Sequence, residues 1–160
     1  MAKRAAPTPT GLRFAQAALV VGLLYAVLSL YWGLGGTWLV DTIARSVRKE
    51  GLALAAAVLK LIAAVLPLLA LRRLSSPAWN RKLWLLTWIE AAILTIYGLV
   101  QTVGDLLAEA GVVHVSASAA HGKLAFYAYL WDPWFLIWGL LVGGALLQGR
   151  RSHSQTAGWA

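Results

Sequence analysis

Hydrophobic residues along the chain gather into four long runs separated by shorter polar segments. The runs cover residues 12–34, 51–71, 83–103 and 124–148. A helix rises ~1.5 Å per residue, so about 20 residues cross the ~30 Å hydrocarbon core of a bilayer, and each run reaches that length. The pattern predicts an all-α fold. The chain is expected to be a polytopic membrane protein with a four-transmembrane-helix bundle over residues 12–148, between tails at 1–11 and 149–160.

The composition agrees with a bilayer environment and favours one class of binding partner over another. Of the 160 residues, 60% are hydrophobic and only 12% are charged, against roughly 25% charged in soluble domains. The net charge of +8 comes mainly from basic residues placed between the apolar runs, which favours membrane lipids over nucleic acid as the partner. No cysteine is present, so disulfides and thiolate chemistry are excluded.

Basic residues flank the runs unequally on the two sides of the predicted bundle. One side carries nine of them: Lys3, Arg4, Arg13, Arg72, Arg73, Arg81, Lys82, Arg150 and Arg151. The other side carries four: Arg45, Arg48, Lys49 and Lys123. Because Lys and Arg are enriched in cytoplasmic loops, both termini are predicted to be cytoplasmic, in a bacterial inner (plasma) membrane.

Three ionisable residues interrupt the predicted spans: Lys60, Glu90 and Asp132. A charge at the bilayer centre costs at least ~2.5–3.5 kcal/mol on insertion scales, so such residues pair, pack or take part in function. Small residues surround Lys60 on one helix face, which predicts that Lys60 faces the bundle. The first run has a similar small face (Gly22, Ala26, Ser29 and Gly33), and the fourth has Gly139 and Gly143 in a G-x-x-x-G spacing. Glu90 comes out roughly 5 Å closer to the cytoplasm, which predicts a salt bridge or a water bridge to Lys60.

The fourth run contains a proline directly after its acidic residue. Pro133 has no N–H, and its ring clashes with the carbonyl of Tyr129 in a continuous helix. Asp before Pro is also typical of an N-cap followed by the first helical position. We therefore expect the fourth helix to be kinked or to restart at Asp132, and its freed backbone groups to lie against protein or a water-filled cavity.

Further polar and aromatic residues share the faces and depths of these three groups, and Asp105 approximately extends the helix face of Glu90, Tyr97 and Gln101. Together they predict an aromatic-lined pocket that opens outward, with Asp132, Glu90 and Lys60 as catalytic residues. The predicted substrate-binding residues are Ser29, Tyr31, Trp32, Tyr97, Gln101, Tyr129, Trp131, Trp134 and Trp138.

Two sequence segments carry a family resemblance. Ser29-Leu30-Tyr31-Trp32 is followed by Gly35-Gly36, and the fourth run contains Leu130-Trp131-Asp132-Pro133-Trp134-Phe135. With these segments the chain resembles a family of small bacterial four-span membrane proteins of unknown function. The resemblance implies the four-span architecture and no catalytic role.

Three classes of function remain open from the sequence. Carboxyl groups kept protonated by apolar surroundings, beside aromatic faces that stabilise cations, suit a cyclase or isomerase acting on a hydrophobic, isoprenoid-like substrate. A structural or accessory subunit would use the same charges to set helix register. A small proton-coupled transporter or channel subunit would use them as a relay, with a homodimer supplying the path. No cofactor is expected, and the pair His114 and His121 is not expected to bind a metal.

Overall fold

The described part of the chain folds into four long helices, one of which is preceded by a π-helical turn. The computed structural model describes residues 8–36, 50–72, 77–112 and 127–156. Its elements are α1 (Pro9–Gly33), α2 (Glu50–Arg72), α3 (Pro77–Glu109), η2 (Tyr127–Trp131) and α5 (Asp132–Thr156). Each of the four α-helices is long and apolar enough to cross a membrane. The predicted all-α fold with four transmembrane helices is confirmed.

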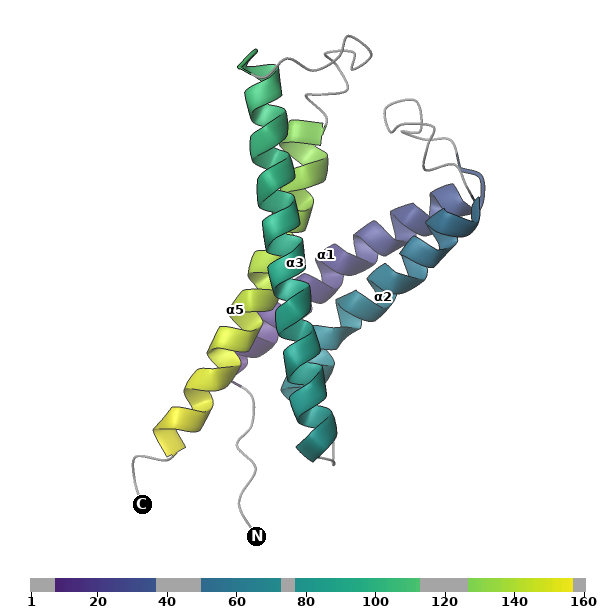
Figure 1. Cartoon of the computed structure of the whole chain (residues 1–160). Helices are drawn as coiled ribbons and strands as arrows, with labels where there is room; N and C mark the ends of the chain where they lie inside the picture. Colours follow the sequence, from purple (N-terminus) through teal and green to yellow (C-terminus); the bar gives the residue numbers. More distant parts are fainter. Residues whose placement is uncertain (1–7, 37–49, 73–76, 113–126, 157–160) are drawn as a thin grey trace.

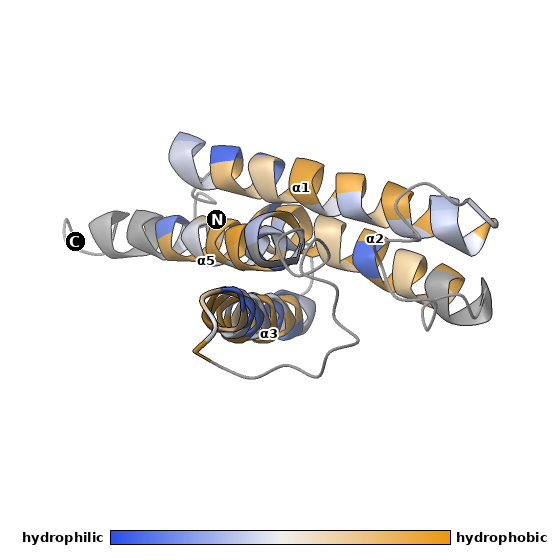
Figure 2. Ribbon diagram, turned by 90° about the horizontal axis from the view of Figure 1, so that it is seen from above, coloured by the Kyte–Doolittle hydropathy of each residue, from blue (hydrophilic) through white to orange (hydrophobic). Residues whose placement is uncertain are grey.

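The helices form two pairs that cross and then separate. Helix α1 lies along α2, α3 lies along α5 and η2, and α1 also packs against α5 (Figure 1). The chain termini lie at one end, which we call the terminal end, and the pairs separate toward the other, which we call the divergent end (Figure 1). Seen from above, the α1/α2 pair runs away from α3 to one side (Figure 2). The divergent end therefore places faces of both pairs opposite one another.

Glycines allow the two helices of the second pair to approach closely. A Cβ atom on Gly139 of α5 would lie 2.5 Å from the backbone nitrogen of Thr95, and one on Gly98 of α3 would collide with the backbone of Leu136. Gly143 has nothing within 4 Å of such an atom, so the Gly139/Gly143 spacing seen in the sequence supports close packing at Gly139 only. The partner surface is supplied by Gly98. Small residues of this kind are how helices associate in lipid.

The core lies where α1 crosses α5. Gly22 of α1 faces Trp138 of α5 and Ala64 of α2, and an added Cβ would come within 2.7 Å of both. Trp138 is 1% exposed and packs with Val142 and Leu146, which are fully buried. The predicted small face of the first span is confirmed, because its four members are buried: Gly22, Ala26, Ser29 and Gly33.

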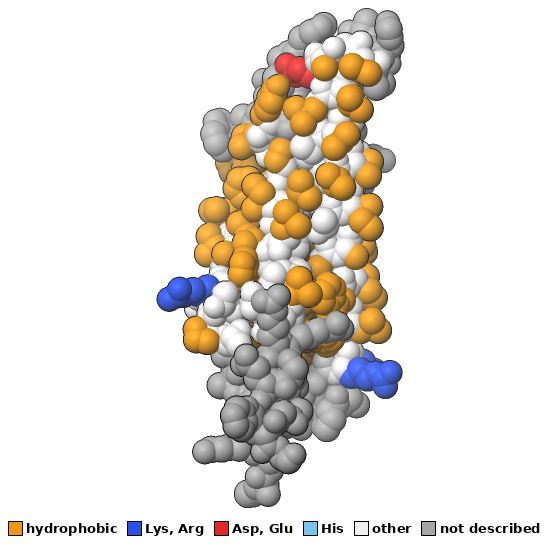
Figure 3. Space-filling model, turned by 90° about the vertical axis from the view of Figure 1, so that its left-hand side faces the viewer, with side chains coloured by type: hydrophobic (Ala, Val, Ile, Leu, Met, Phe, Trp, Pro, Cys, Tyr) orange, Lys and Arg blue, Asp and Glu red, His pale blue; other side chains and the backbone are white. Residues whose placement is uncertain are grey.

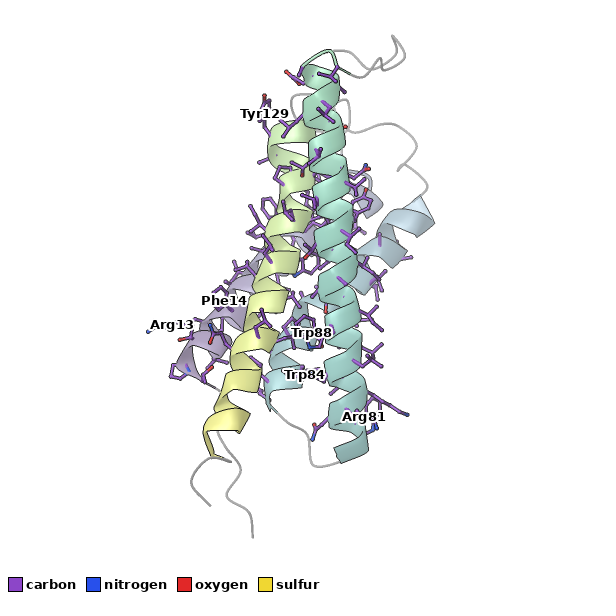
Figure 4. The ribbon with its side chains drawn as sticks, turned by 60° about the vertical axis from the view of Figure 1, so that its left-hand side comes forward. Arg13, Phe14, Arg81, Trp84, Trp88 and Tyr129 are labelled. Carbon is purple, nitrogen blue, oxygen red and sulfur yellow. The ribbon has the colours of Figure 1, made fainter. Side chains whose placement is uncertain are left out.

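The outer surface is apolar around the middle of the molecule. Large side chains such as Val27, Ile93 and Val100 are about 61% exposed, as expected for helices that face lipid. Figure 3 shows Lys and Arg side chains toward the terminal end and acidic side chains at the opposite end. Arg13 and Arg81 lie near the terminal end, whereas Tyr129 lies at the divergent end (Figure 4). The charge asymmetry of the sequence is thus also an asymmetry along the bundle.

Candidate functional site

Lys60 is bound by two residues of the neighbouring helix. Its ammonium group donates a hydrogen bond to Ser29 Oγ at 2.6 Å and lies 3.8 Å from the centre of the Tyr25 ring. Ser29 and Tyr25 are both buried, at 3% and 4% exposure. Lys60 therefore faces the bundle as predicted, and α1 supplies a polar and a π partner that stabilise its charge.

Glu90 does not form the predicted salt bridge with Lys60. Both of its carboxyl oxygens are buried and find no hydrogen-bond partner among the described residues. The reason lies in the arrangement of the helices, since α2 packs along α1, and its contact with α3 is much less extensive. Counting residues along each span placed Lys60 and Glu90 at similar depths in the bilayer, but depth does not show which helix faces Lys60.

Tyr25 is the centre of a group of rings that joins the two helix pairs. Its ring meets Trp131 edge to face at 4.7 Å and Phe135 at 4.8 Å. Trp134 lies 6.4 Å away and donates its indole N–H to the Val21 carbonyl at 3.2 Å. We call this group, with the two further rings described next, the aromatic cluster.

The aromatic cluster extends to α1 and α3. Trp32 of α1 lies 5.2 Å from Trp131, and Tyr97 of α3 lies 5.1 Å from Phe135. Rings from α1, α3, η2 and α5 are thereby linked. Sequence reasoning missed Tyr25 and Phe135. A signal existed for Tyr25, because it precedes Ser29 by four residues and so shares its helix face.

The predicted substrate-binding residues divide into two groups. Trp32, Tyr97, Trp131 and Trp134 belong to the aromatic cluster, and Ser29 binds Lys60 beside it. Outside it lie Tyr31 and Tyr129, which are 42% and 66% exposed, Gln101, which is also exposed, and Trp138, which is in the core. The structure brings the first group together at the divergent side of the core.

Asp132 begins α5 directly after the π-helical turn. The helix runs on without a break from η2 into α5, and the hydrogen-bonding pattern changes from π to α at this residue, so the expected irregularity is a π turn rather than a new start. The wider π turn suits a position followed by Pro133, which cannot donate a backbone hydrogen bond. Asp132 is 2% exposed, and its Oδ2 atom finds no hydrogen-bond donor in the described part of the chain. A buried carboxyl is thus placed beside Trp131 and near Phe135.

Asp132 meets a second carboxyl group from α3. The side chains of Asp132 and Asp105 lie close enough to interact electrostatically. The Tyr97 hydroxyl lies close enough to both carboxyls to feel their charge, and Gln101 is its neighbour one turn further along α3. Gln101 itself is exposed. Asp105, which the sequence only aligned with this helix face, is therefore part of the site.

Polar residues follow one flank of α3 over much of its length. Glu90, Tyr97, Gln101 and Asp105 are seven, four and four residues apart, which keeps them within about 80° of one another at ~100° per residue. Tyr97 contacts Phe135 of α5, and Phe135 contacts Tyr25 of α1, so the flank is connected to α1 through α5 at this level. We call it the polar flank of α3.

A comparison with known protein families identifies the family of this chain. The family model described as protein of unknown function (DUF3995) matches residues 22–142, which is most of the chain. The chain belongs to this family. The family match includes the aromatic cluster, Lys60, Glu90, Asp105 and Asp132, and its description assigns no activity. No curated protein matches the chain, and no solved structure does.

Metal ligands do not gather in the described residues. Within residues 8–36, 50–72, 77–112 and 127–156, no group of three or more His, Asp or Glu side chains could hold a metal ion. His114 and His121 lie outside the described residues. The chemistry available at the site is that of carboxyl, phenol and ammonium groups beside aromatic faces.

Proposed function

We propose that this protein is an intramembrane acid–base enzyme that isomerises or cyclises a hydrophobic, isoprenoid-like substrate. The substrate would lie between the two helix pairs at the divergent end, against the aromatic cluster. The observation that carries the proposal is the position of Asp132. This buried carboxyl at the change from π to α helix lies near a second carboxyl from α3 and directly follows Trp131 of the aromatic cluster.

The proposed reaction begins with a proton transfer from Asp132 to a carbon–carbon double bond. One C–H bond forms, the O–H bond breaks, and a carbocation remains on the neighbouring carbon. Aromatic faces stabilise such a cation by ~0.5–2 kcal/mol each when it is desolvated. The cation then loses a proton from an adjacent carbon to the carboxylate, or is first attacked by a second double bond of the same chain. Either route returns the proton to Asp132 and needs no oxidant or cofactor.

Lys60 and Glu90 would act differently from Asp132. Lys60 already occupies one face of the Tyr25 ring and holds α2 against α1 through Ser29. Its proposed role is to fix Tyr25 in place for the edge contacts with Trp131 and Phe135. Glu90 lies about two helical turns from Tyr97 toward the terminal end of the polar flank, and it would serve as a second proton acceptor for the deep end of the substrate.

A small proton-coupled transporter or channel subunit is a second candidate, because of the polar flank of α3. Glu90 and Asp105 are about 22 Å apart along the helix axis at ~1.5 Å per residue, which is most of the hydrocarbon thickness. Such a ladder suits proton movement as well as catalysis. Exposed Tyr97 and Gln101 would then be completed by a second copy of the chain in a homodimer.

The proposed location is the bacterial inner membrane, with both termini in the cytoplasm and lipids around the helices. Support comes from Arg13 and Arg81 at the terminal end and from the nine-to-four distribution of basic residues in the sequence. The divergent end would then face the periplasmic half of the bilayer.

Deuterium incorporation tests the proposed function. The protein in lipid nanodiscs is incubated in D₂O with a panel of polyprenyl alcohols and polyenes, and mass spectrometry counts deuterium in the recovered substrate. Acid catalysis at a double bond is expected to place solvent deuterium on carbon, and Asp132→Asn should abolish it while leaving the folded yield unchanged. Glu109→Gln, at an exposed position on α3, is the matched control and should keep full incorporation.

Full incorporation by Asp132→Asn would reduce Asp132 to a helix cap. No incorporation into any substrate by the wild type would favour the transporter or the accessory subunit.

A further inference from the structure

Lys60 carries its ammonium group near the middle of a long apolar helix, and its partners are neutral. Ten residues of α2 precede it and twelve follow it, so it lies far from both ends of the helix. The Ser29 hydroxyl, at 2.6 Å, and the Tyr25 ring, at 3.8 Å, carry no negative charge. Among the side chains that the structure describes, no carboxylate lies within ion-pair distance of Lys60. This part of the chain therefore supplies no counter-ion.

The ammonium group has the capacity for a further partner. It carries three N–H donors, and among the described residues Ser29 Oγ is the acceptor of one of them. Ionisable groups inside membrane spans pair with one another or with backbone carbonyls, or they mark the path of a substrate. Because both protein partners of Lys60 are neutral, an anionic group is the partner that best completes the site.

Lys60 also keeps some exposure on a helix face that is otherwise buried. Ala57 and Ala64, one turn before and one turn after it on the same face, are 1% and 0% exposed, whereas Lys60 is half-buried. Helix α2 packs chiefly along α1, and the α1/α2 pair separates from the other pair toward the divergent end (Figure 1). A small polar group can therefore reach the ammonium group without displacing the alanines.

The surroundings of this ammonium group toward the divergent end are aromatic. Trp32 follows Ser29 by three residues on the same face of α1, and its ring lies 5.2 Å from that of Trp131. The Trp131 ring in turn meets Tyr25 at 4.7 Å, on whose face the ammonium group lies. A molecule with its head at Lys60 would thus have rings of the aromatic cluster beside its tail. The arrangement suits a ligand with one anionic head and a hydrophobic tail.

We propose that Lys60 binds the carboxylate head of a hydrophobic acid whose hydrocarbon tail lies against the aromatic cluster. A carboxylic acid can enter the hydrocarbon core in its neutral form and bind as the carboxylate, with its proton released to water. A phosphate monoester carries about 1.5 to 2 negative charges at neutral pH, so its entry costs far more. Ser29 and Tyr25 hold the ammonium group in place for the carboxylate. That this acid is the substrate of Asp132 rests on the proposed function, whereas its binding at Lys60 does not.

Photolabelling with a carboxylic acid tests the site. The probe is an isoprenoid acid that carries a diazirine beside its carboxyl group, irradiated with the wild-type protein in nanodiscs. Labels are expected on the peptides that hold Ser29 and Lys60. Three unlabelled competitors share one tail and differ in the head, which is an acid, an alcohol or a monophosphate. The acid should compete at a concentration at least about tenfold lower than the alcohol, as a hydrogen bond to a charged group predicts. The monophosphate should compete no better than the alcohol.

Two variants separate the contribution of the head from that of the tail. Each competitor partitions equally into the bilayer whichever variant is present, so the acid-to-alcohol ratio isolates the contribution of the side chain. Lys60→Met should remove the advantage of the acid over the alcohol. Lys82→Met, at an exposed position on α3 toward the terminal end, is the matched control and should keep the wild-type ratio.

The proposed site is overturned by an acid that competes no better than the alcohol in the wild type, or by an advantage that persists in Lys60→Met. A monophosphate that competes better than the acid would overturn the carboxylate as the head group. Should Lys60→Met fail to fold, the wild-type ratio and the position of the labels decide, and labels away from Ser29 and Lys60 reject the site. No turnover is measured, so failure here leaves the deuterium experiment unaffected, and failure of that experiment leaves acid binding at Lys60 in place.

Discussion

A single methyl group on α5 should separate α3 from α5, the two helices that carry Asp105 and Asp132. In Gly139→Ala the new Cβ would lie 2.5 Å from the backbone nitrogen and Oγ1 of Thr95 and 3.0 Å from the carbonyl carbon of Leu94. These are mostly backbone atoms of α3, which cannot rotate away as a flexible side chain can. Gly143→Ala, one helical turn further along α5, is the matched control, because nothing lies within 4 Å of its Cβ.

The expected difference between the two variants follows from overpacking. Both exchange Gly for Ala inside a helix, which by itself stabilises by about 0.5–1 kcal/mol, and this contribution cancels in the comparison. Overpacking against fixed neighbours costs about 1–3 kcal/mol, so Gly139→Ala should be less stable than Gly143→Ala by about that amount. Reversible unfolding in mixed micelles by titration with sodium dodecyl sulfate, followed by tryptophan fluorescence, measures the difference. Equal stabilities for the two variants would refute the close α3/α5 contact at Gly139.

Two further predictions concern Lys60 and the membrane orientation. Lys60→Met should lower stability by about 1.5–3 kcal/mol, the contribution typical of a hydrogen bond to a charged group, and adding Glu90→Gln should not restore it. Recovery in the double variant, measured in the same micelle titration, would instead indicate an ion pair between Lys60 and Glu90. The native chain has no cysteine, so Val112→Cys and Arg81→Cys report the orientation of α3. A membrane-impermeant thiol reagent added to intact cells should label Val112→Cys alone, and labelling of Arg81→Cys alone would reverse the orientation.

The sequence predicted those features that depend on one helix at a time. Run length predicted the four spans, and the spacing of Gly22, Ala26, Ser29 and Gly33 predicted the buried face of α1. The irregularity of the fourth helix just before Asp132 followed from Pro133, because a missing N–H is a local property. The direction of Lys60 followed from the small residues around it.

Features that depend on which helices are neighbours were not predictable. Lys60 was matched with Glu90 by depth, but depth carries no information on the side of the bundle, and Ser29 and Tyr25 of α1 proved to be its partners. Trp138 shares a helix side with Trp134, yet the crossing of α1 over α5 at Gly22 places it in the core. Asp105 was aligned with the polar flank, and only the antiparallel register of α3 and α5 brings it to Asp132.

The presence of a hydrophobic substrate between the two helix pairs can be tested most directly by photolabelling. A polyprenyl alcohol that carries a diazirine is irradiated with the Asp132→Asn protein in nanodiscs, and the labelled peptides are mapped by mass spectrometry. The proposal predicts labels on the segments that hold Tyr25, Trp32 and Trp131, and their loss when unlabelled polyprenyl alcohol is added in excess. Labels that fall on lipid-facing residues such as Val20, Ile93 and Leu140, without competition, would contradict it.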